Sequence, residues 1–278
     1  MGPCSLVLAL LACGTSPSLL PPLAQVTTGA PAATGPLEPS EPAPSDAAVR
    51  ERDAGEDALD ASAACPPEMV LVRGGYCPKV RQICARWVDP PGPYHEYRCA
   101  EYERPSTCLA ARVAKRFCID REEYAPPGET LPIANQSWTS AGALCASLGK
   151  RLCLESEWEL ACEGEDMHPY PYGDGFTRDA TACNIDQREL GRPESGLRDL
   201  RAPITAYPRC VSPYGVHGMS GNVEEWATLD RGVAPDRSSM KGAWWLPGKN
   251  TCRAATLGHG EIYRGPQVGV RCCRDAGS

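Results

Sequence analysis

Residues 65–278 are predicted to form a disulfide-rich domain of the α+β class with much irregular structure. Three features of the sequence favour this class. Helical periodicity is confined to two short segments, 138–148 and 155–162. The rest is rich in glycine, proline and short apolar runs such as 69–72, which reads as a strand. The domain also carries 14 of the chain's 16 cysteines. Periodicity alone does not define which fold of this class the domain adopts.

The chain divides by composition near residue 64. Residues 14–64 contain eight prolines but no aromatic residue and no cysteine, whereas all six Trp, both Phe and all ten Tyr follow them. A segment without apolar rings to bury cannot offset its own chain entropy. We therefore expect 14–64 to be a disordered tether, with a root-mean-square span of roughly 40 Å. The remaining 214 residues are enough for one domain.

Charge and hydropathy argue against a nucleic-acid partner and against a membrane-spanning segment. The net charge is −7, and the acidic excess is spread along the chain. No basic stripe with interleaved aromatic residues is present, so we do not expect nucleic acid as a partner. No apolar run beyond the N-terminus approaches the ~20 residues that cross a bilayer.

The N-terminus carries a short apolar run, Ser5–Ala12, followed directly by Cys13. The sequence L-L-A-C resembles the lipobox of bacterial lipoproteins, in which the cysteine is lipidated after cleavage. No Lys or Arg precedes the run, which departs from the usual signal peptide. We expect residues 1–13 to be a signal and lipobox segment with Cys13 as the lipidation site. An ordinary export signal is the alternative.

The cysteines indicate an oxidising compartment. Fourteen is an even number, and this density predicts an exported protein with up to seven disulfides, whose pairing the sequence does not define. Zinc is not favoured, because no C-x-x-C pair occurs. Adjacent Cys272 and Cys273 are expected to pair with different partners. Residues 77–108 hold four cysteines and are expected to be a disulfide-pinned insertion, serving stability or binding a partner.

Both predicted helices carry terminal signals. Ser137 is suited to cap the helix at 138–148, with Gly149 just past its end. In the second helix, Glu155 and Glu157 lie in the first turn, where carboxylates complement the helix dipole. Trp158 is expected to be a core residue.

Four blocks occur in a fixed order in the domain: 132–164 (beginning P-I-A-N-Q-S-W and ending G-K-R-L-C-L-E-S-E-W-E-L-A-C-E-G), 218–226 (G-M-S-G-N-V-E-E-W), Lys241-Gly242, and 269–272 (G-V-R-C). In this order they resemble the formylglycine-generating enzyme, or sulfatase-modifying factor, family. Residues 69–76 and 117–124 fit as well, so the resemblance covers nearly all of 65–278. It implies the sulfatase-modifying-factor fold, which is distantly like C-type lectin domains. The insertion at 77–108 is not needed by the family core. The family usually has a capping Thr where this chain has Leu154, so that cap is lost.

The resemblance also implies calcium. In the family, backbone carbonyls and a glutamate of the G-N-V-E-E-W block surround Ca²⁺, a hard ion that takes six to eight oxygens. A second family calcium site begins with an A-N-I segment, which residues 182–185 (A-C-N-I) resemble. Gly218 departs from the family, whose best-studied members have an asparagine ligand there. The candidate ligands are Met219, Gly221, Val223 and Glu225 in the first site, and Asn184, Ile185 and Asp199 in the second.

The active-site thiols of the family are missing. Its oxidases hold Cu(I) on a C-x-x-x-x-C pair just after the G-G-S turn, where this chain reads Ala243–Gly248 without a cysteine. Cys252 aligns with a later, structural cysteine. Formylglycine formation and copper binding are therefore not expected. His259 and Glu261 are weak candidates for a metal-binding or acid–base pair.

These observations favour a non-catalytic binding module of this family at the bacterial cell envelope. We expect an outer-membrane or periplasmic lipoprotein, or otherwise a secreted protein, that contacts the membrane only through its lipid anchor. The partner would be an unknown protein, or a peptide or glycan ligand. One alternative is a metal- or O₂-dependent protein- or small-molecule-modifying enzyme of the formylglycine-generating and sulfoxide-synthase superfamily. A purely structural envelope protein is the other.

Overall fold

The computed structural model describes residues 64–188 and 198–277. Cys13 and the segment 1–63 lie outside the described residues. Two α-helices and twelve short strands, with much irregular structure between them, confirm the predicted α+β class within the described ranges. None of the helices in these ranges is both long and apolar enough to cross a membrane.

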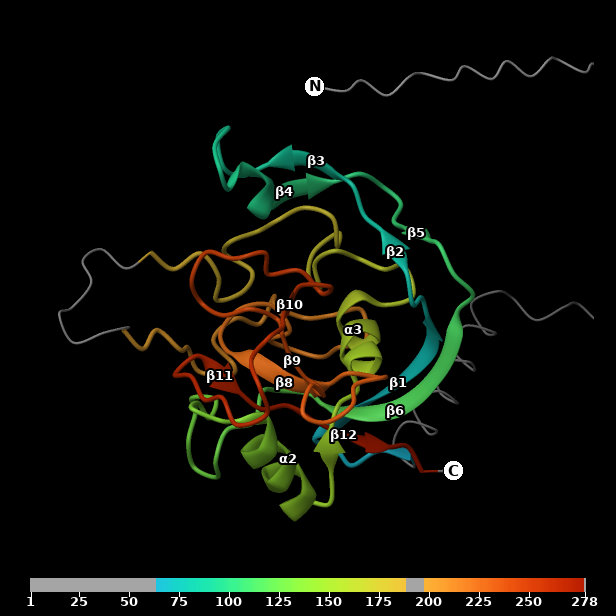
Figure 1. The fold of residues 1–278 in the computed structure, drawn as a ribbon, viewed down its shortest axis with the longest axis vertical. Helices are drawn as coiled ribbons and strands as arrows, with labels where there is room; N and C mark the ends of the chain where they lie inside the picture. Colours follow the sequence, from blue (N-terminus) through green and yellow to red (C-terminus); the bar gives the residue numbers. More distant parts are fainter. Residues whose placement is uncertain (1–63, 189–197, 278) are drawn as a thin grey trace, which may run out of the picture. The chain divides into compact units, whose positions relative to one another are not determined.

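The first sheet has the strand order β1-β6-β12-β7 and is antiparallel throughout. Its two long strands lie side by side over eight residue pairs and curve past helix α3 (Figure 1). Val72, Phe117 and Ile119 are buried because alternate residues of each strand face the helix. The strands of this sheet are β1 (Met69–Tyr76), β6 (Val113–Asp120), β7 (Arg151–Leu152) and β12 (Cys272–Asp275).

The second sheet has the order β10-β9-β8-β11, with β11 parallel to β8 and the other pairs antiparallel. Two blocks that the sequence singles out lie at its central strands. The block at 218–226 leads into β8, and Lys241-Gly242 lies at the end of β9. The strands are β8 (Glu224–Thr228), β9 (Ser238–Lys241), β10 (Ala255–Thr256) and β11 (Val268–Gly269).

Helix α2 (Trp138–Ser147) begins as predicted, because the Ser137 hydroxyl accepts a hydrogen bond from the Ser140 amide at 3.1 Å. Helix α3 (Glu155–Glu163) has no side-chain cap at Leu154. Its first turn is capped from a distance instead. A carboxylate oxygen of Asp230, in the loop after β8, accepts from the Ser156 amide at 2.9 Å.

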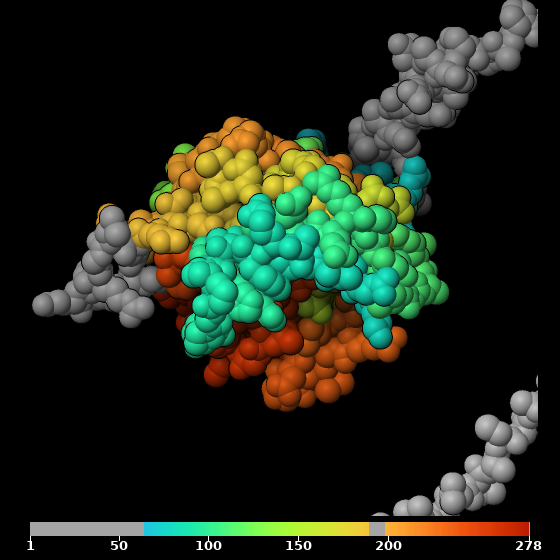
Figure 2. Space-filling model, turned by 90° about the horizontal axis from the view of Figure 1, so that it is seen from above, coloured from blue at the N-terminus to red at the C-terminus, as the bar shows by residue number. Residues whose placement is uncertain are grey.

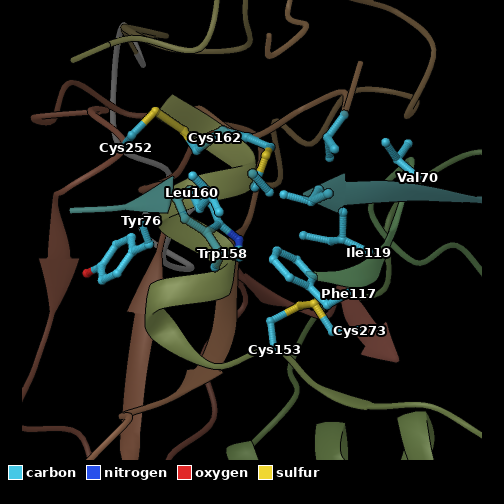
Figure 3. Close-up of a cluster of buried hydrophobic side chains, with 14 residues drawn as sticks. Val70, Tyr76, Phe117, Ile119, Cys153, Trp158, Leu160, Cys162, Cys252 and Cys273 are labelled. Atoms are coloured by element: carbon cyan, nitrogen blue, oxygen red, sulfur yellow. Dashed lines mark hydrogen bonds between the residues drawn. A yellow bond between two sulfur atoms is a disulfide. The ribbon is translucent and has the colours of Figure 1, made fainter. Parts of the chain in front are cut away.

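The main core lies between the first sheet and α3. Trp158 is 1% exposed and projects from α3 toward Phe117 and Ile119, as the prediction of a core role requires (Figure 3). A second apolar cluster joins α2 to the second sheet through Trp226, Met240 and Val268.

The insertion at 77–108 forms two small antiparallel ladders, β2 with β5 and β3 with β4. Cys77–Cys108 and Cys84–Cys99 lie within it. A single turn of 3₁₀ helix, η1 (His95–Tyr97), connects the two strands of the outer ladder. The ladder strands are β2 (Val80–Arg81), β3 (Cys84–Trp87), β4 (Cys99–Tyr102) and β5 (Thr107–Cys108).

Seven disulfides hold the described domain, which confirms the predicted number. Cys272 and Cys273 pair with different partners, as expected. The five bridges outside the insertion are Cys65–Cys118, Cys145–Cys272, Cys153–Cys273, Cys162–Cys252 and Cys183–Cys210.

Candidate functional site

The turn at 218–226 is held by its glycines and by a neighbouring turn. A Cβ on Gly221 would lie 2.2 Å from the Asn184 carbonyl oxygen, and the φ of Gly221 is +80°, so only glycine fits. The Gly221 amide donates to the Gly242 carbonyl at 2.8 Å. This bond ties the turn before β8 to the turn after β9.

Glu225, the expected carboxylate ligand, lies in a buried ion pair. The Arg271 Nε atom lies 2.9 and 2.8 Å from its two oxygens, and Trp158 Nε1 donates to Oε2 at 2.6 Å. Neither Glu225 nor Arg271 is more than 1% exposed. Burial opposes the charge of Arg271, but the carboxylates around it, Glu225 foremost, together raise the pKa of Arg271.

This arrangement bears on calcium at the first turn. The structure places Met219, Gly221, Val223 and Glu225 in one turn, but both carboxylate oxygens of Glu225 already accept hydrogen bonds. An ion bound there would lie beside a guanidinium and would require this pair to open. Within 64–188 and 198–277, no group of three or more His, Cys, Asp and Glu side chains is arranged to hold a metal. Calcium at this turn stays a prediction.

The second candidate set lies against the first turn. The Asn184 side chain donates to Asn222 Oδ1 at 2.9 Å, and its carbonyl accepts from the Asn222 amide at 2.9 Å. Ile185 is buried beside Gly221. Asp199 is paired instead with Arg201 at 2.7 Å, which lowers the pKa of Asp199. The structure thus joins Asn184 and Ile185 to the first turn and engages Asp199 elsewhere.

Glu123 belongs to this network, although sequence reasoning did not single it out. Its two oxygens accept from Asn222 Nδ2 at 2.6 Å and from the Val223 amide at 3.2 Å. Burial, followed by the charge of Glu225, raises the pKa of Glu123 to about 8. The available signal was its place in the block at 117–124.

The Lys241–Cys252 turn adjoins a cavity of about 390 Å³. Ala243 takes a positive φ of +57°, a conformation that costs an alanine roughly 1 kcal/mol. Cys252 is buried in its bridge to Cys162. All 14 cysteines of the described residues are paired in this way, so these residues offer no free thiol. The cavity is lined by Tyr97, Met240, Ala243, Lys249, Arg253, Ala254, Ala255 and Thr256.

A buried charge cluster lies behind this cavity. Arg253 pairs with Glu163 and lies 2.8 Å from Glu159, while Lys241 lies 2.7 Å from Glu159. The Tyr76 hydroxyl donates to Glu159 at 2.7 Å. Burial raises the pKa of Glu163 to about 7, although the guanidinium of Arg253 acts in the opposite direction. The cluster holds Arg253 in place against the cavity.

A larger cavity of about 880 Å³ lies next to the first. Tyr76 lines the larger cavity, Arg253 lines the smaller one, and Arg253 Nη1 donates to the Tyr76 hydroxyl at 3.1 Å. The linings of the two cavities are therefore in contact at this pair. We call the combined hollow the furrow. Figure 2 shows it between the blue-green insertion and the orange and red segments after β8.

His259 and Glu261 are engaged with different partners. The His259 ring stacks on Tyr263 with centroids 3.9 Å apart. Glu261 forms a two-pronged ion pair with Arg237, with atoms 2.7 and 2.8 Å apart. The structure thus engages each of them with a different neighbour, and their role as a metal-binding or acid–base pair stays a prediction.

Fold and turns together define a domain of the sulfatase-modifying-factor class without its active-site cysteines. Residues 60–276 match the family model described as "Sulfatase-modifying factor enzyme 1-like domain", so the chain belongs to this family.

Curated relatives include active and inactive proteins. The chain is 32% identical over 158 residues to "Inactive C-alpha-formylglycine-generating enzyme 2" of Mus musculus, covering 53% of this chain and 50% of that protein. It is 36% identical over 99 residues to "Formylglycine-generating enzyme" of Thermomonospora curvata, covering 34% and 32%. The match thus spans about half the length of the mouse relative. Among solved structures, CarF has a TM-score of 0.49 at 16% identity, covering 76% of this chain and 98% of that chain.

Proposed function

We propose that this chain is an exported, non-catalytic member of the sulfatase-modifying-factor family that acts as a binding module. One observation carries the proposal: the turn where the family's oxidases hold two thiols contains none, and every cysteine of the described residues is in a disulfide. The similarity to a relative named as inactive supports it. The seven disulfides agree with an oxidising, exported setting.

The test is mass spectrometry of a C-x-P-x-R peptide incubated with the oxidised, purified chain, Cu(I) and O₂. The Thermomonospora curvata enzyme serves as the positive control. We expect the control to convert the peptide cysteine to formylglycine and this chain to leave the peptide mass unchanged. Conversion by this chain would mean that one of its disulfides opens to supply thiols, and the proposal would fail.

A second candidate function has one specific observation in its favour. The chain is 32% identical over 148 residues to "Hercynine oxygenase" of Mycobacterium tuberculosis, covering 52% of this chain and 32% of that protein. A metal- or O₂-dependent modifying activity is therefore the alternative. Elemental analysis of the purified chain separates the two: stoichiometric iron or copper favours the enzyme, and calcium alone favours the binding module.

Calcium is the cofactor that we propose for the turn at 218–226. Its motif supports the ion, whereas the buried Glu225–Arg271 pair competes with it. A bound ion stabilises the folded chain by RT ln(1 + [L]/Kd), about 2.7 kcal/mol at a hundredfold excess over Kd. Calcium should raise the unfolding temperature, and magnesium at equal concentration should not. An identical melting curve in EDTA and in millimolar calcium would argue against the site.

We also propose attachment to the outer membrane or periplasmic face through a lipid on Cys13. The L-L-A-C sequence supports this, and the partner would then be a protein, peptide or glycan of the envelope. Metabolic labelling with a palmitate analogue should mark the chain and not its Cys13→Ser variant. Equal labelling of both would place the lipid elsewhere, and no labelling of either would favour a secreted protein.

A further inference from the structure

The smaller cavity of the furrow carries one sign of charge. Its ionised lining residues are Lys249 and Arg253, and no carboxylate lines it. The remaining walls are mostly small or apolar, among them Ala243, Ala254 and Met240. At about 390 Å³, the cavity falls within the range of small-ligand sites. It can admit a side chain that combines a hydrocarbon stem with a negative end.

The two cations differ in what they can still bind. Arg253 directs its N–H groups to Glu163, Glu159, the Tyr76 hydroxyl and the Cys77 carbonyl, so its donors are used. Lys249 is exposed, and its Nζ lies 5.7 Å from the centre of the Tyr97 ring. Across 64–188 and 198–277, no carboxylate lies within ion-pair distance of Lys249. Its ammonium group is therefore available to a ligand, and the insertion supplies the aromatic ring beside it.

The larger cavity has a different character. Its apolar lining includes Pro78, Val113 and Val233, contributed by the insertion, the first sheet and the loop after β8. It also carries two cations and three carboxylates, so its net charge is slightly negative. The furrow is thus positive at one end and apolar with mixed charge at the other. The charged side chains of the larger cavity are Lys115, Arg231, Glu155, Asp230 and Asp236.

We infer that the furrow binds an extended peptide that places an acidic side chain in the smaller cavity, with its carboxylate on Lys249. This rests on the proposed binding function and names the class of its ligand. A charge-assisted hydrogen bond from an ammonium to a carboxylate is stronger than a neutral one. Charge complementarity favours an acidic residue at this end, and the apolar lining suits the flanking residues. Tyr97 packs against the stem of the acidic side chain.

The experiment is fluorescence polarisation with the full oxidised chain and three labelled twelve-residue peptides. Every third position carries Glu in the first peptide, Gln in the second and Lys in the third. The remaining positions are the same in all three and alternate between Ala and Pro. We expect the Glu peptide to bind at least about tenfold more tightly than the Gln peptide, because a hydrogen bond from the ammonium to a carboxylate is stronger than one to a neutral amide. Added salt should reduce this difference.

Variants test the assignment to Lys249. Lys249→Glu should weaken binding of the Glu peptide at least about tenfold, and Lys249→Arg should retain most of it. The control is Arg274→Glu, a charge reversal at an exposed residue of β12 that lines neither cavity. It should leave the affinity within about twofold. Tyr97→Ala should weaken binding several-fold, and circular dichroism should confirm that each variant is folded.

Three results would overturn this inference. A Lys peptide that binds as tightly as the Glu peptide would exclude an acidic ligand but leave the binding module intact. Equal losses in Lys249→Glu and Arg274→Glu would mean that only net charge matters. If none of the three peptides bound, peptides would be excluded as the ligand class of the furrow. The proposed function has its own readout, since only formylglycine in the sulfatase peptide shows that the chain has kept catalysis.

Discussion

Two turns of this chain that contact each other differ in how closely they match the family. The turn at 218–226 keeps the family's G-N-V and E-W residues and is almost entirely buried. The turn at 241–252, whose Gly242 carbonyl accepts from the Gly221 amide, lacks the family's active-site cysteine pair and lines a cavity. The difference follows from what each turn contacts.

In the first turn, each replacement leaves something buried without a partner. Glu225 accepts hydrogen bonds from both Arg271 and Trp158. Arg271 also donates to the backbone carbonyls of Asp120 and His217. Removing one member would strand a charge in the core. In the second turn, Lys249 is exposed, so a substitution at this position costs little stability. Burial thus constrains the residues of the first turn, whereas position 249 of the second turn tolerates substitution.

The largest effect is expected at the buried pair. Arg271→Ala should lower the free energy of unfolding by about 3–5 kcal/mol, because it leaves Glu225 charged and unpaired in the core. Urea denaturation measures this loss. The matched control is Arg209→Ala, whose exposed pair with Asp179 contributes about 0–1 kcal/mol. Equal losses of unfolding free energy in the two variants would mean that the buried ion pair contributes no more than the exposed one.

The charge cluster behind the cavity should show itself in the pH dependence of stability. The pKa of Glu163 is about 7 in the folded chain, against 4.5 for an ordinary glutamate. Because the folded pKa is raised, the folded state keeps this proton to higher pH than the unfolded state. Stability therefore falls as pH rises from about 4.5 to 7, by about 3 kcal/mol in total, and changes little above 7.

Glu163→Gln should abolish this loss, so the difference in unfolding free energy between the two chains should change with pH in the same window. The charged neighbours of Glu163 are Arg253, Glu159 and Lys241, and they remain in both chains. Exposed Glu129→Gln is the control and should follow the parent chain. Parallel curves for parent and Glu163→Gln would show that Glu163 ionises normally.

A smaller difference separates two disulfides. Cys162–Cys252, which fixes the end of the open turn, spans 90 residues, and Cys84–Cys99 in the insertion spans 15. In the chain-entropy model the longer loop contributes about 1.5 kcal/mol more stability. Paired alanine variants compared by urea denaturation give this difference. A costlier loss at Cys84–Cys99 would mean that the insertion is part of the folding core.

Features that depend on residues close together in the sequence could be predicted. Ser137 capping α2 is a signal between residues three apart, and it was predicted as found. Family membership came from blocks whose order repeats a known pattern. Trp158 was predicted in the core because its helix face carries apolar residues at helical spacing.

Long-range pairings were beyond local reasoning. The capping of Ser156 by Asp230 joins residues 74 apart, and the bond between Arg253 and Glu163 joins residues 90 apart. No local pattern encodes such partners. For the same reason, the spacing of His259 and Glu261 could not reveal that one ring stacks on Tyr263 and the other side chain pairs with Arg237.

The smallest effect is expected at Lys249. Its ammonium group lies beside the ring of Tyr97, and an exposed cation–π contact contributes about 0.5–1 kcal/mol. Lys249→Ala should therefore lower the free energy of unfolding by no more than about 0.5–1 kcal/mol, measured in the same urea series as Arg271→Ala. Such a small loss would show that the Lys249 side chain contributes little to the fold. A loss of about 2 kcal/mol or more would instead make this lysine part of the scaffold, and the contrast between the two turns would fail.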